Sequence, residues 1–482
     1  MASFSEPDVY ADLKPEQAAE LREKIAKARA AQKIIETYDQ EYIDRLCQAV
    51  AWSVSNKSTF LRLVDMSIEE SKLGDYETRG AKRFKIRGIL RDCLRQKSVG
   101  LIEDIPEKGI KKYAKPVGII GCVVPTTNPD LTPAGNAIYA IKARNVAIFA
   151  PHPRAKNTSF ETVRLMREAL EKMGAPADIV QCLQNVSIPM TKALMAEADL
   201  VIATGGQDLV RTAYSSGTPA YGVGAGNSTM VIDETALQNI KECANNTMLS
   251  KTSDFGSGCS ADGNLIVHTE VVAPLTTALI EEGGHLLTPE EQSLVKKVMW
   301  SEDCKRLPDT VALSPQGIAK AAGFTVADDR KFLIATSDGI GDGYDNAFCR
   351  EKLTTLLTIH NYGTNFDDAI QMAKDIYNVG GIGHSCGVYS FNEEHIHKIA
   401  LTAPVSRMMI RQPQSKANAG SFTNGMPMTS SLGCGTWGGN IISENVNLKH
   451  YMNVTWVSTP IAEDRPSDQE LFGEFYDPAL EA

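Results

Sequence analysis

The sequence predicts an α/β protein that combines a doubly wound parallel sheet with a second α/β domain of similar size. Short β-branched runs such as 146–149 and 200–204 alternate with helical patterns, as in parallel strands joined by crossover helices. A second series of such runs begins after Cys243. The chain has 482 residues, of which 43% are hydrophobic and 22% charged, so it can bury the cores of two or three domains.

The N-terminal part is expected to be helical. From Pro15 to about residue 54 the apolar residues recur at helical spacing, and a second charged helical region continues to about residue 97. The next stretch carries the turn residues Pro106 and Gly109. A short exposed hairpin or arm is predicted there.

The two α/β regions follow in order along the chain. The first has predicted strands at 118–124, 146–149, 179–183 and 200–204, with crossover helices at 131–144, 159–173 and 189–198. The segment 117–235 is therefore interpreted as a nucleotide-binding-type sheet. The second region has predicted strands at 264–268, 331–335, 354–359, 387–390 and 407–410. From Pro413 to Asn440 the Ser, Gly, Asn and Thr content predicts loops.

Composition narrows the possible partners. The formal charge of −10 and the lack of a long Lys or Arg run argue against nucleic acid. No stretch resembles a secretory signal or reaches the roughly 20 apolar residues that span a bilayer. The ten cysteines include no C-x-x-C pair, and His395 and His397 fit the polar face of a helix, so no metal is expected. A cytoplasmic enzyme without a membrane partner is the expectation.

Cys259 is a candidate nucleophile because it lies among glycines and small polar residues directly before a predicted strand. Such a backbone lets a substrate reach the sulfur and lets the residue's own N–H face an oxyanion. A cysteine filling a tight turn is the alternative. His384, in His384-Ser-Cys386, is predicted to line the site as an acid or base, with Cys386 as packing, and a purely structural His384 is the alternative.

Other candidate groups lie at predicted strand ends. Asn128 follows the first strand, where an open sheet places ligand groups, and its amide is suited to donate to an oxyanion. An Asn before Pro is also a turn signal. The glycine clusters at 204–206 and 222–226 would let backbone approach a cofactor, although neither is the usual G-x-G-x-x-G fingerprint.

The chain resembles the coenzyme A-acylating aldehyde dehydrogenases, and the resemblance runs from about residue 15 to 455. It rests on motifs that occur in the same order: Gly118-Ile-Ile-Gly-Cys-Val-Val-Pro-Thr-Thr-Asn-Pro, Ala150-Pro-His-Pro-Arg-Ala-Lys, Ala203-Thr-Gly-Gly, Gly222-Val-Gly-Ala-Gly-Asn, Ser250-Lys-Thr, Cys259, Gly380-Gly-Ile-Gly-His and Ser431-Leu-Gly-Cys-Gly-Thr-Trp-Gly-Gly-Asn.

The resemblance implies an aldehyde dehydrogenase-like fold with three parts. These are a Rossmann-type cofactor domain (1–103 and 116–240), an α/β catalytic domain (241–430), and a small oligomerisation arm and tail (104–115 and 445–482). A homodimer or homotetramer is expected.

The resemblance also implies roles for the matched residues. Cys259 would attack the aldehyde, Asn128 and the Cys259 N–H would form the oxyanion site, and His384 would assist acyl transfer. The implied cofactor-binding residues are Pro125, Thr126, His152, Arg154, Thr204, Gly205, Gly206, Gly222, Val223, Gly224 and Glu351. Glu351 matches the acid that holds the nicotinamide ribose. NAD and NADP both remain open, because Arg154 and Lys156 favour NADP only mildly.

Two departures from related patterns bear on the substrates. Gly222-Val-Gly-Ala stands where hydrolytic relatives carry Glu-Leu-Gly-Gly, whose glutamate activates water. Without that base a thioacyl enzyme should persist until coenzyme A takes the acyl group.

Arg411 lies in a run that resembles acylating sulfoacetaldehyde dehydrogenases and predicts a short anionic aldehyde, bound through a sulfonate or carboxylate. The alternative is that Arg411 caps a strand end or forms a subunit contact. Acetaldehyde as substrate, a hydrolytic enzyme and a non-catalytic assembly subunit are the remaining alternatives.

Overall fold

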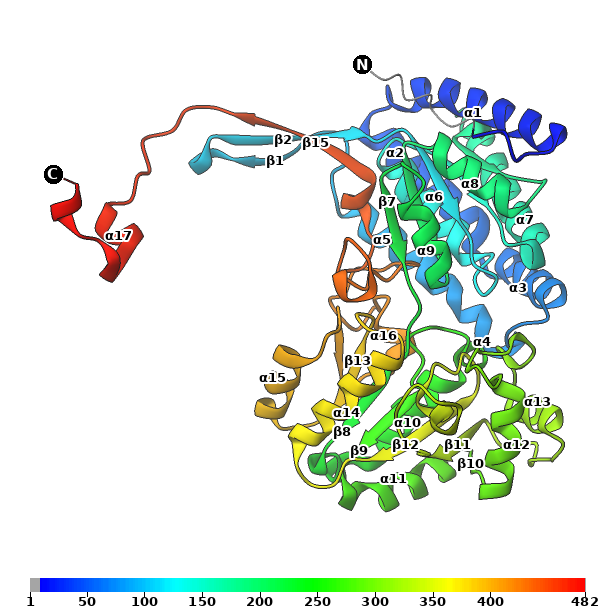
Figure 1. Cartoon of the computed structure of the whole chain (residues 1–482). Helices are drawn as coiled ribbons and strands as arrows, with labels where there is room; N and C mark the ends of the chain where they lie inside the picture. Colours follow the sequence, from blue (N-terminus) through cyan, green and yellow to red (C-terminus); the bar gives the residue numbers. More distant parts are fainter. Residues whose placement is uncertain (1–8, 482) are drawn as a thin grey trace.

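The structure is a computed structural model and describes residues 9–481. Two parallel sheets and a long antiparallel arm organise the chain (Figure 1). The α/β prediction with an aldehyde dehydrogenase-like arrangement is confirmed. None of the helices within 9–481 is both long and apolar enough to cross a membrane.

The first sheet has five parallel strands in the order β5-β4-β3-β6-β7. Their bounds are β3 Ile119–Val123, β4 Val146–Ala150, β5 Val180–Cys182, β6 Leu200–Thr204 and β7 Ala220–Val223. Almost every residue of these strands is buried, which explains why they are continuous apolar runs in the sequence.

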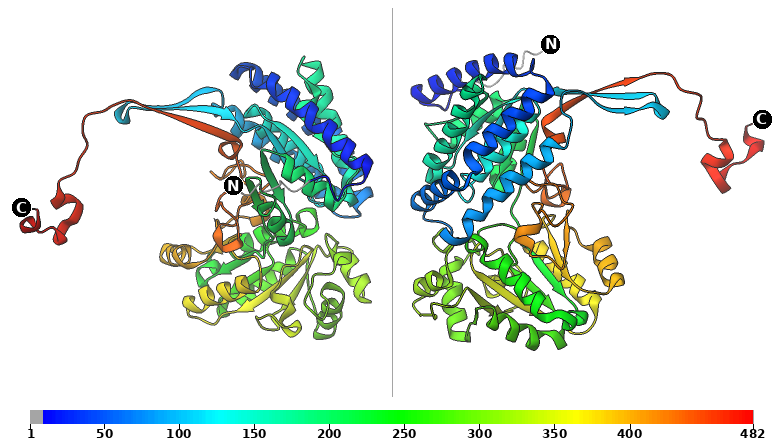
Figure 2. Two further views of the ribbon diagram at one scale, coloured as in Figure 1. Left: turned by 45° about the horizontal axis from the view of Figure 1, so that its top comes forward. Right: turned by 180° about the vertical axis from the view of Figure 1, so that it is seen from behind.

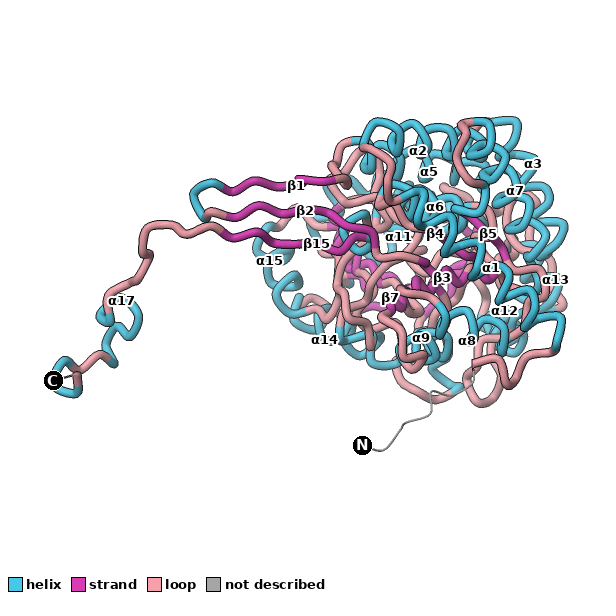
Figure 3. Tube along the Cα trace, turned by 90° about the horizontal axis from the view of Figure 1, so that it is seen from above, coloured by secondary structure: helices cyan, strands magenta, loops and turns pink. Residues whose placement is uncertain are grey.

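Helices cover both faces of this sheet. Figure 3 shows α2, α5 and α6 on one side of the strands and α1, α8 and α9 on the other. The helices of this domain are α1 Pro15–Ile35, α2 Gln40–Ser55, α3 Lys57–Ser71, α4 Tyr76–Arg79, α5 Arg83–Leu94, α6 Leu131–Lys142, α7 Lys156–Lys172, α8 Ile188–Glu197 and α9 Gln207–Tyr214. The helical region predicted from Pro15 is split, because Asp39 caps α2 by accepting from the Tyr42 N–H.

The second sheet has seven parallel strands in the order β10-β11-β12-β9-β8-β13-β14. Their bounds are β8 Thr229–Ile232, β9 Asn264–Val267, β10 Gly284–Leu286, β11 Phe332–Thr336, β12 Leu356–Asn361, β13 Cys386–Tyr389 and β14 Met408–Ile410. The helices around it are α10 Ile240–Thr252, α11 Thr269–Glu281, α12 Pro289–Met299, α13 Pro315–Ala322, α14 Phe366–Val379, α15 Glu393–Thr402 and α16 Gln414–Ala417.

β8 changes the boundary that the sequence predicts between the two domains. The segment 117–235 was expected to form one sheet, yet β8 lies inside the second sheet, between β9 and β13. The chain therefore enters the second domain just after β7, earlier than residue 240.

The arm is a three-stranded antiparallel sheet in the order β1-β2-β15. Its strands are β1 Gly100–Ile105, β2 Ile110–Pro116 and β15 Met452–Ser458. The arm extends away from both domains, and the tail that contains α17 (Asp468–Phe472) lies beyond its tip (Figure 2).

Candidate active site

Cys259 lies in the loop between α10 and β9, and this loop is held in an unusual conformation. Asp254 and Phe255 have φ of 49° and 50°, in the left-handed region that costs non-glycine residues about 1–3 kcal/mol each. The Cys259 side chain is partly exposed. Gly226 packs so closely on the Cys259 carbonyl that a Cβ at that position would collide with it. Cys259 is therefore partly exposed on a loop whose backbone is closely packed.

His384 meets this sulfur. Its Nε2 lies 3.0 Å from the Cys259 Sγ, and its side chain is fully buried. Gly383 precedes it with φ of 86°, and a Cβ there would collide with the Cys434 carbonyl, so the turn that delivers His384 requires glycine. The prediction that His384 lines the Cys259 site agrees with this distance.

A closed ring of hydrogen bonds decides which nitrogen of His384 carries the proton. The Ser228 hydroxyl donates to the Cys259 carbonyl over 3.2 Å, so its single proton is used there and it accepts from the Ser385 hydroxyl over 3.0 Å. Ser385 in turn must accept from His384 Nδ1 over 2.8 Å. His384 Nε2 is then a free acceptor that faces the thiol proton of Cys259.

Burial keeps this pair neutral. Desolvation, followed by the charge of Arg407, lowers the pKa of His384 to about 3. Desolvation, followed by the charge of Glu351, raises the pKa of Cys259 to about 12. At neutral pH the site therefore holds a thiol and an imidazole rather than an ion pair.

Asn128 is held by Lys82, a residue that the sequence analysis missed. The Lys82 ammonium donates to Asn128 Oδ1 over 2.7 Å and lies 2.5 Å from the Asp254 carboxylate. Since the Oδ1 of Asn128 is occupied, its NH₂ group is the part that can serve a ligand. Asp254 belongs to the Cys259 loop, so Lys82 links the Asn128 turn to the nucleophile loop across the two domains.

The same junction buries further charges. Arg79, fully buried, lies 3.1 Å from Asp254 and 3.7 Å from Asp130. Burial alone would raise the Asp254 pKa, but Lys82 and Arg79 outweigh it and hold that pKa below its usual value. Asp254 is therefore a lasting anion that orders both loops.

Glu351 lies in the surroundings of Cys259. Its Oε1 accepts from the Gly226 N–H over 3.2 Å, and Gly226 is the residue packed on Cys259. Desolvation raises the Glu351 pKa to about 7.

A cavity of about 590 Å³ opens at the carboxyl ends of β3, β4 and β6, a size typical of small-molecule sites. Six predicted cofactor residues line it: Pro125, Thr126, His152, Thr204, Gly205 and Gly206. Gly206 caps the N-terminus of α9, and the space beside it is open, so a phosphate can approach the backbone there. The residues present fit a dinucleotide.

The other predicted cofactor residues lie outside the described lining of this cavity. Arg154 donates from Nη2 to the Ser71 carbonyl over 3.0 Å, and Gly222 and Val223 belong to β7. Gly224 lies between β7 and β8. Their assignment to the cofactor stays a prediction.

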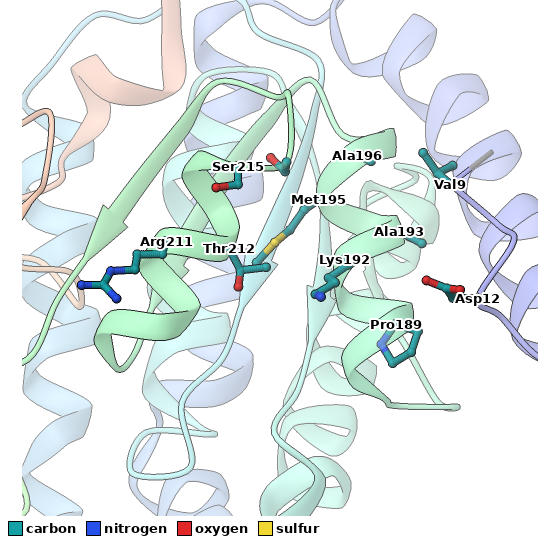
Figure 4. A pocket seen from close by; sticks show the side chains of 11 residues that line it. Val9, Asp12, Pro189, Lys192, Ala193, Met195, Ala196, Arg211, Thr212 and Ser215 are labelled. Atoms are coloured by element: carbon teal, nitrogen blue, oxygen red, sulfur yellow. The ribbon is translucent and has the colours of Figure 1, made fainter. Parts of the chain in front are cut away.

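A second cavity, of about 450 Å³, lies beside α8 and α9 (Figure 4). Lys192 and Thr212 line both cavities. Arg211 and Asp12 also line the second one. Sequence reasoning missed it because its lining joins the N-terminal segment to two distant helices.

Arg411 is occupied at the end of β14. Its Nη1 donates to the Ser390 carbonyl over 2.5 Å, and its guanidinium lies over the Phe391 ring at 4.6 Å. The cation that reaches the Cys259 group is Arg407, which donates to the His384 carbonyl over 2.9 Å. Substrate binding by Arg411 stays a prediction.

Two further sequence interpretations can be placed. Cys386 is fully buried and its sulfur accepts from Thr229 over 3.5 Å, so it packs as predicted. His395 lies 2.8 Å from the buried Asp233 carboxylate and stacks on Phe366. Glu234 lies beside this pair, with the ligand atoms of all three residues within 4.8 Å of one another, so the expectation that no metal binds here stays a prediction.

Known proteins are similar to this chain. The model of the aldehyde dehydrogenase family matches residues 5–292. A sulfoacetaldehyde dehydrogenase of Acholeplasma sp is 42% identical over 94% of this chain and 93% of its own, and an acetylating succinate-semialdehyde dehydrogenase of Clostridium kluyveri is 37% identical over 94% and 99%. The crystal structure of an acetylating aldehyde dehydrogenase from Geobacillus thermoglucosidasius superposes with a TM-score of 0.88 at 32% identity, over 94% of this chain and 99% of that one.

Proposed function

The chain belongs to the aldehyde dehydrogenase family and is an acylating member of it, and from this premise we propose that it oxidises a short anionic aldehyde, with sulfoacetaldehyde favoured, to the acyl-coenzyme A thioester. NAD or NADP accepts a hydride from the reacting carbon when it is bound. The observation that carries the proposal is the 3.0 Å contact between Cys259 Sγ and the unprotonated Nε2 of His384.

The first step is addition of the Cys259 sulfur to the aldehyde carbon. His384 Nε2 takes the thiol proton as the carbon–sulfur bond forms, because the ring through Ser385 leaves that nitrogen as an acceptor. The negative charge that develops on the carbonyl oxygen is stabilised by the Asn128 NH₂ group and the Cys259 N–H. Lys82 orients Asn128 for this task.

The second step is transfer of the acyl group to a thiol. Loss of a hydride leaves the acyl group on Cys259 as a thioester. Gly222-Val-Gly-Ala supplies no carboxylate to activate water, so the thioester waits for the coenzyme A thiol. Once the proton taken in the first step has passed from His384 to solvent, His384 is again a base, placed to take the proton of that thiol and to return it to the Cys259 sulfur as it leaves.

The size and lining of the two cavities suit the two large co-substrates, the dinucleotide and coenzyme A. The 590 Å³ cavity, with its open space at Gly206, fits a dinucleotide pyrophosphate. The neighbouring cavity shares Lys192 with the first, and the charge of Lys192 suits a further phosphate of NADP or coenzyme A.

An anionic aldehyde is supported by the relatives. Sulfoacetaldehyde carries a sulfonate and succinate semialdehyde a carboxylate, and both names occur among similar proteins. Arg411 is our candidate for this anion through the N–H groups that Ser390 leaves free. A lower kcat/KM for sulfoacetaldehyde, with that for acetaldehyde unchanged in Arg411→Ala, would support this role.

The test follows the absorbance of reduced cofactor with NAD and NADP, sulfoacetaldehyde, succinate semialdehyde and acetaldehyde, with and without coenzyme A. We expect turnover that requires coenzyme A and is fastest with an anionic aldehyde, and no turnover by Cys259→Ala. Equal rates without coenzyme A would contradict acyl transfer and indicate a hydrolytic enzyme. A preference for acetaldehyde would contradict the anionic substrate alone.

A further inference from the structure

The C-terminal tail leaves the molecule at the tip of the arm. β15 pairs with β2 along its whole length, from Met452 opposite Pro116 to Ser458 opposite Ile110, and the Thr459 N–H donates to the Gly109 carbonyl over 2.8 Å. Seven strand residues carry the chain roughly 20 Å from the body. Figures 1 and 3 show the tail beyond this tip, separate from both domains.

The tail carries apolar side chains that the rest of residues 9–481 leaves uncovered. Five large ones are more than half exposed: Ile461, Leu471, Phe472, Phe475 and Leu480, with Phe475 at 85%. α17 has five residues, far fewer than the ~12 that an isolated helix needs to be stable in water, although Ser467 and Glu470 form a capping box at its start. Such a segment needs a surface to fold against.

The tail is also strongly acidic. Residues 459–481 contain seven carboxylates and one arginine, Arg465, which pairs with Glu463 at 2.9 Å. Its partner surface should therefore be cationic and apolar together.

The outer face of α5 has this character, and we call it the α5 face: Trp52, Phe84 and Phe422 with Arg83, Arg87 and Arg91. The three rings are 64%, 45% and 56% exposed. Arg83 lies over Phe84 at 4.3 Å, Arg87 over Trp52 at 5.9 Å and Arg91 over Phe422 at 5.0 Å.

Charge on this face is largely unpaired. Residues 83–97 contain six cations and a single carboxylate, Asp92, which is bound by Arg91. Within the described chain no carboxylate lies at ion-pair distance from Arg83 or Arg87. Exposed aromatic rings interleaved with unpaired arginines are typical of binding surfaces rather than of solvated ones.

We propose that the acidic tail of one chain docks on the α5 face of a second copy of this chain. Phe472 and Phe475 would enter between the exposed rings, and the tail carboxylates would pair with Arg83 and Arg87. The partner is a second copy because the arm holds the tail away from its own domains and because β15 is an edge strand, open to another chain.

The test places a photo-crosslinking benzoylphenylalanine at position 475 of the full-length protein. We expect a product of twice the chain mass on a denaturing gel, with the crosslink mapped by mass spectrometry to Trp52, Phe84, Phe422 or the peptides beside them. A crosslink within single chains, one that maps elsewhere, or no doubled product would overturn the proposal.

Reversing the charges on the α5 face and on the tail tests whether the two surfaces pair. Arg83→Glu with Arg87→Glu should lower the doubled product at least about tenfold, since like charges at an interface cost several kcal/mol. Adding Asp468→Lys with Glu470→Lys should restore it in part. Lys297→Glu with Lys320→Glu, exposed on α12 and α13, should leave it unchanged. An unchanged yield in the α5 variant, with its melting temperature preserved, would overturn the assignment of this face.

Discussion

The ammonium group of Lys82 donates to the Oδ1 of Asn128 over 2.7 Å and so fixes which end of the amide faces a ligand. Nothing in the sequence links the two residues, which are 46 positions apart. The contact makes Lys82 a positioning residue for the proposed oxyanion site, and Lys82 also binds Asp254 in the Cys259 loop.

Lys82→Met should therefore lower kcat about 10- to 100-fold with a smaller effect on the aldehyde KM, because loss of an oxyanion donor costs about 10²–10³ and Lys82 acts through that donor. In Asn128→Ala the further change Lys82→Met should cost little, since the two residues act as a unit. Steady-state kinetics of the four proteins measure this. Additive losses would show that Lys82 acts independently of Asn128, through Asp254 or through folding, and melting temperatures report the folding effect directly.

The Ser385 hydroxyl should affect the turnover rate although it does not contact the Cys259 sulfur. It belongs to the hydrogen-bond ring that also contains Ser228 and His384. Ser385→Ala removes the acceptor for His384 Nδ1–H, so the proton can move to Nε2 and block the base. We expect kcat to fall about tenfold, less than the 10²–10⁴ expected for His384→Gln.

Ser406→Ala is the matched control for the ring, because the buried Ser406 Oγ has no hydrogen-bond partner in the described chain. It should keep full activity. An equal loss in Ser385→Ala and Ser406→Ala would argue against a role for the tautomer.

The reactivity of the thiol should show the raised Cys259 pKa. The thiolate is the form that alkylating reagents attack, and burial raises this pKa to about 12. The rate of inactivation by iodoacetamide without ligands should be low at pH 7 and still rising at pH 10. A plateau near pH 8, with the labelled peptide shown to contain Cys259, would contradict a neutral thiol–imidazole pair.

Sequence patterns predicted the strands well because a parallel strand buried on both faces must be a continuous apolar run, as at β3 and β6. They did not predict which sheet a strand joins. β8 follows β7 after a short Gly-rich stretch, and nothing local shows that the chain crosses to the second domain there.

The site was predictable to the extent that its residues have distinctive local surroundings. Cys259 and His384 stand in glycine-rich turns because a close approach excludes side chains, as at Gly383. Lys82, Ser228 and Arg407 have ordinary neighbours, and only the fold gives them partners. Arg411 was predicted from its charge alone; one of its guanidinium nitrogens donates to the Ser390 carbonyl and the group lies over Phe391, so its role as the anion site stays a prediction.

His360 predicts how the protein responds to acid. Its ring lies 2.8 Å from the Ser337 hydroxyl and 3.1 Å from Asn264 Oδ1, and desolvation followed by the charge of Lys352 lowers its pKa to about 3. The unfolded imidazole takes up a proton near pH 6.5 that the folded one cannot. The stability contributed by the neutral ring is therefore complete above pH 6.5 and is lost progressively as the pH falls toward 3.

His360→Gln removes the imidazole that takes up a proton in the unfolded state, so the variant should lose less stability in acid than the wild type. Between pH 6.5 and 5 the wild-type protein should lose about 1.6 kcal/mol more unfolding free energy than this variant, because the unfolded imidazole is already half protonated at pH 6.5 and the slope approaches 1.36 kcal/mol for each pH unit only below that pH. Urea unfolding of both proteins at both pH values measures the difference. Parallel losses in His360→Gln and wild type would mean that the folded His360 takes up its proton in the same range as the unfolded one.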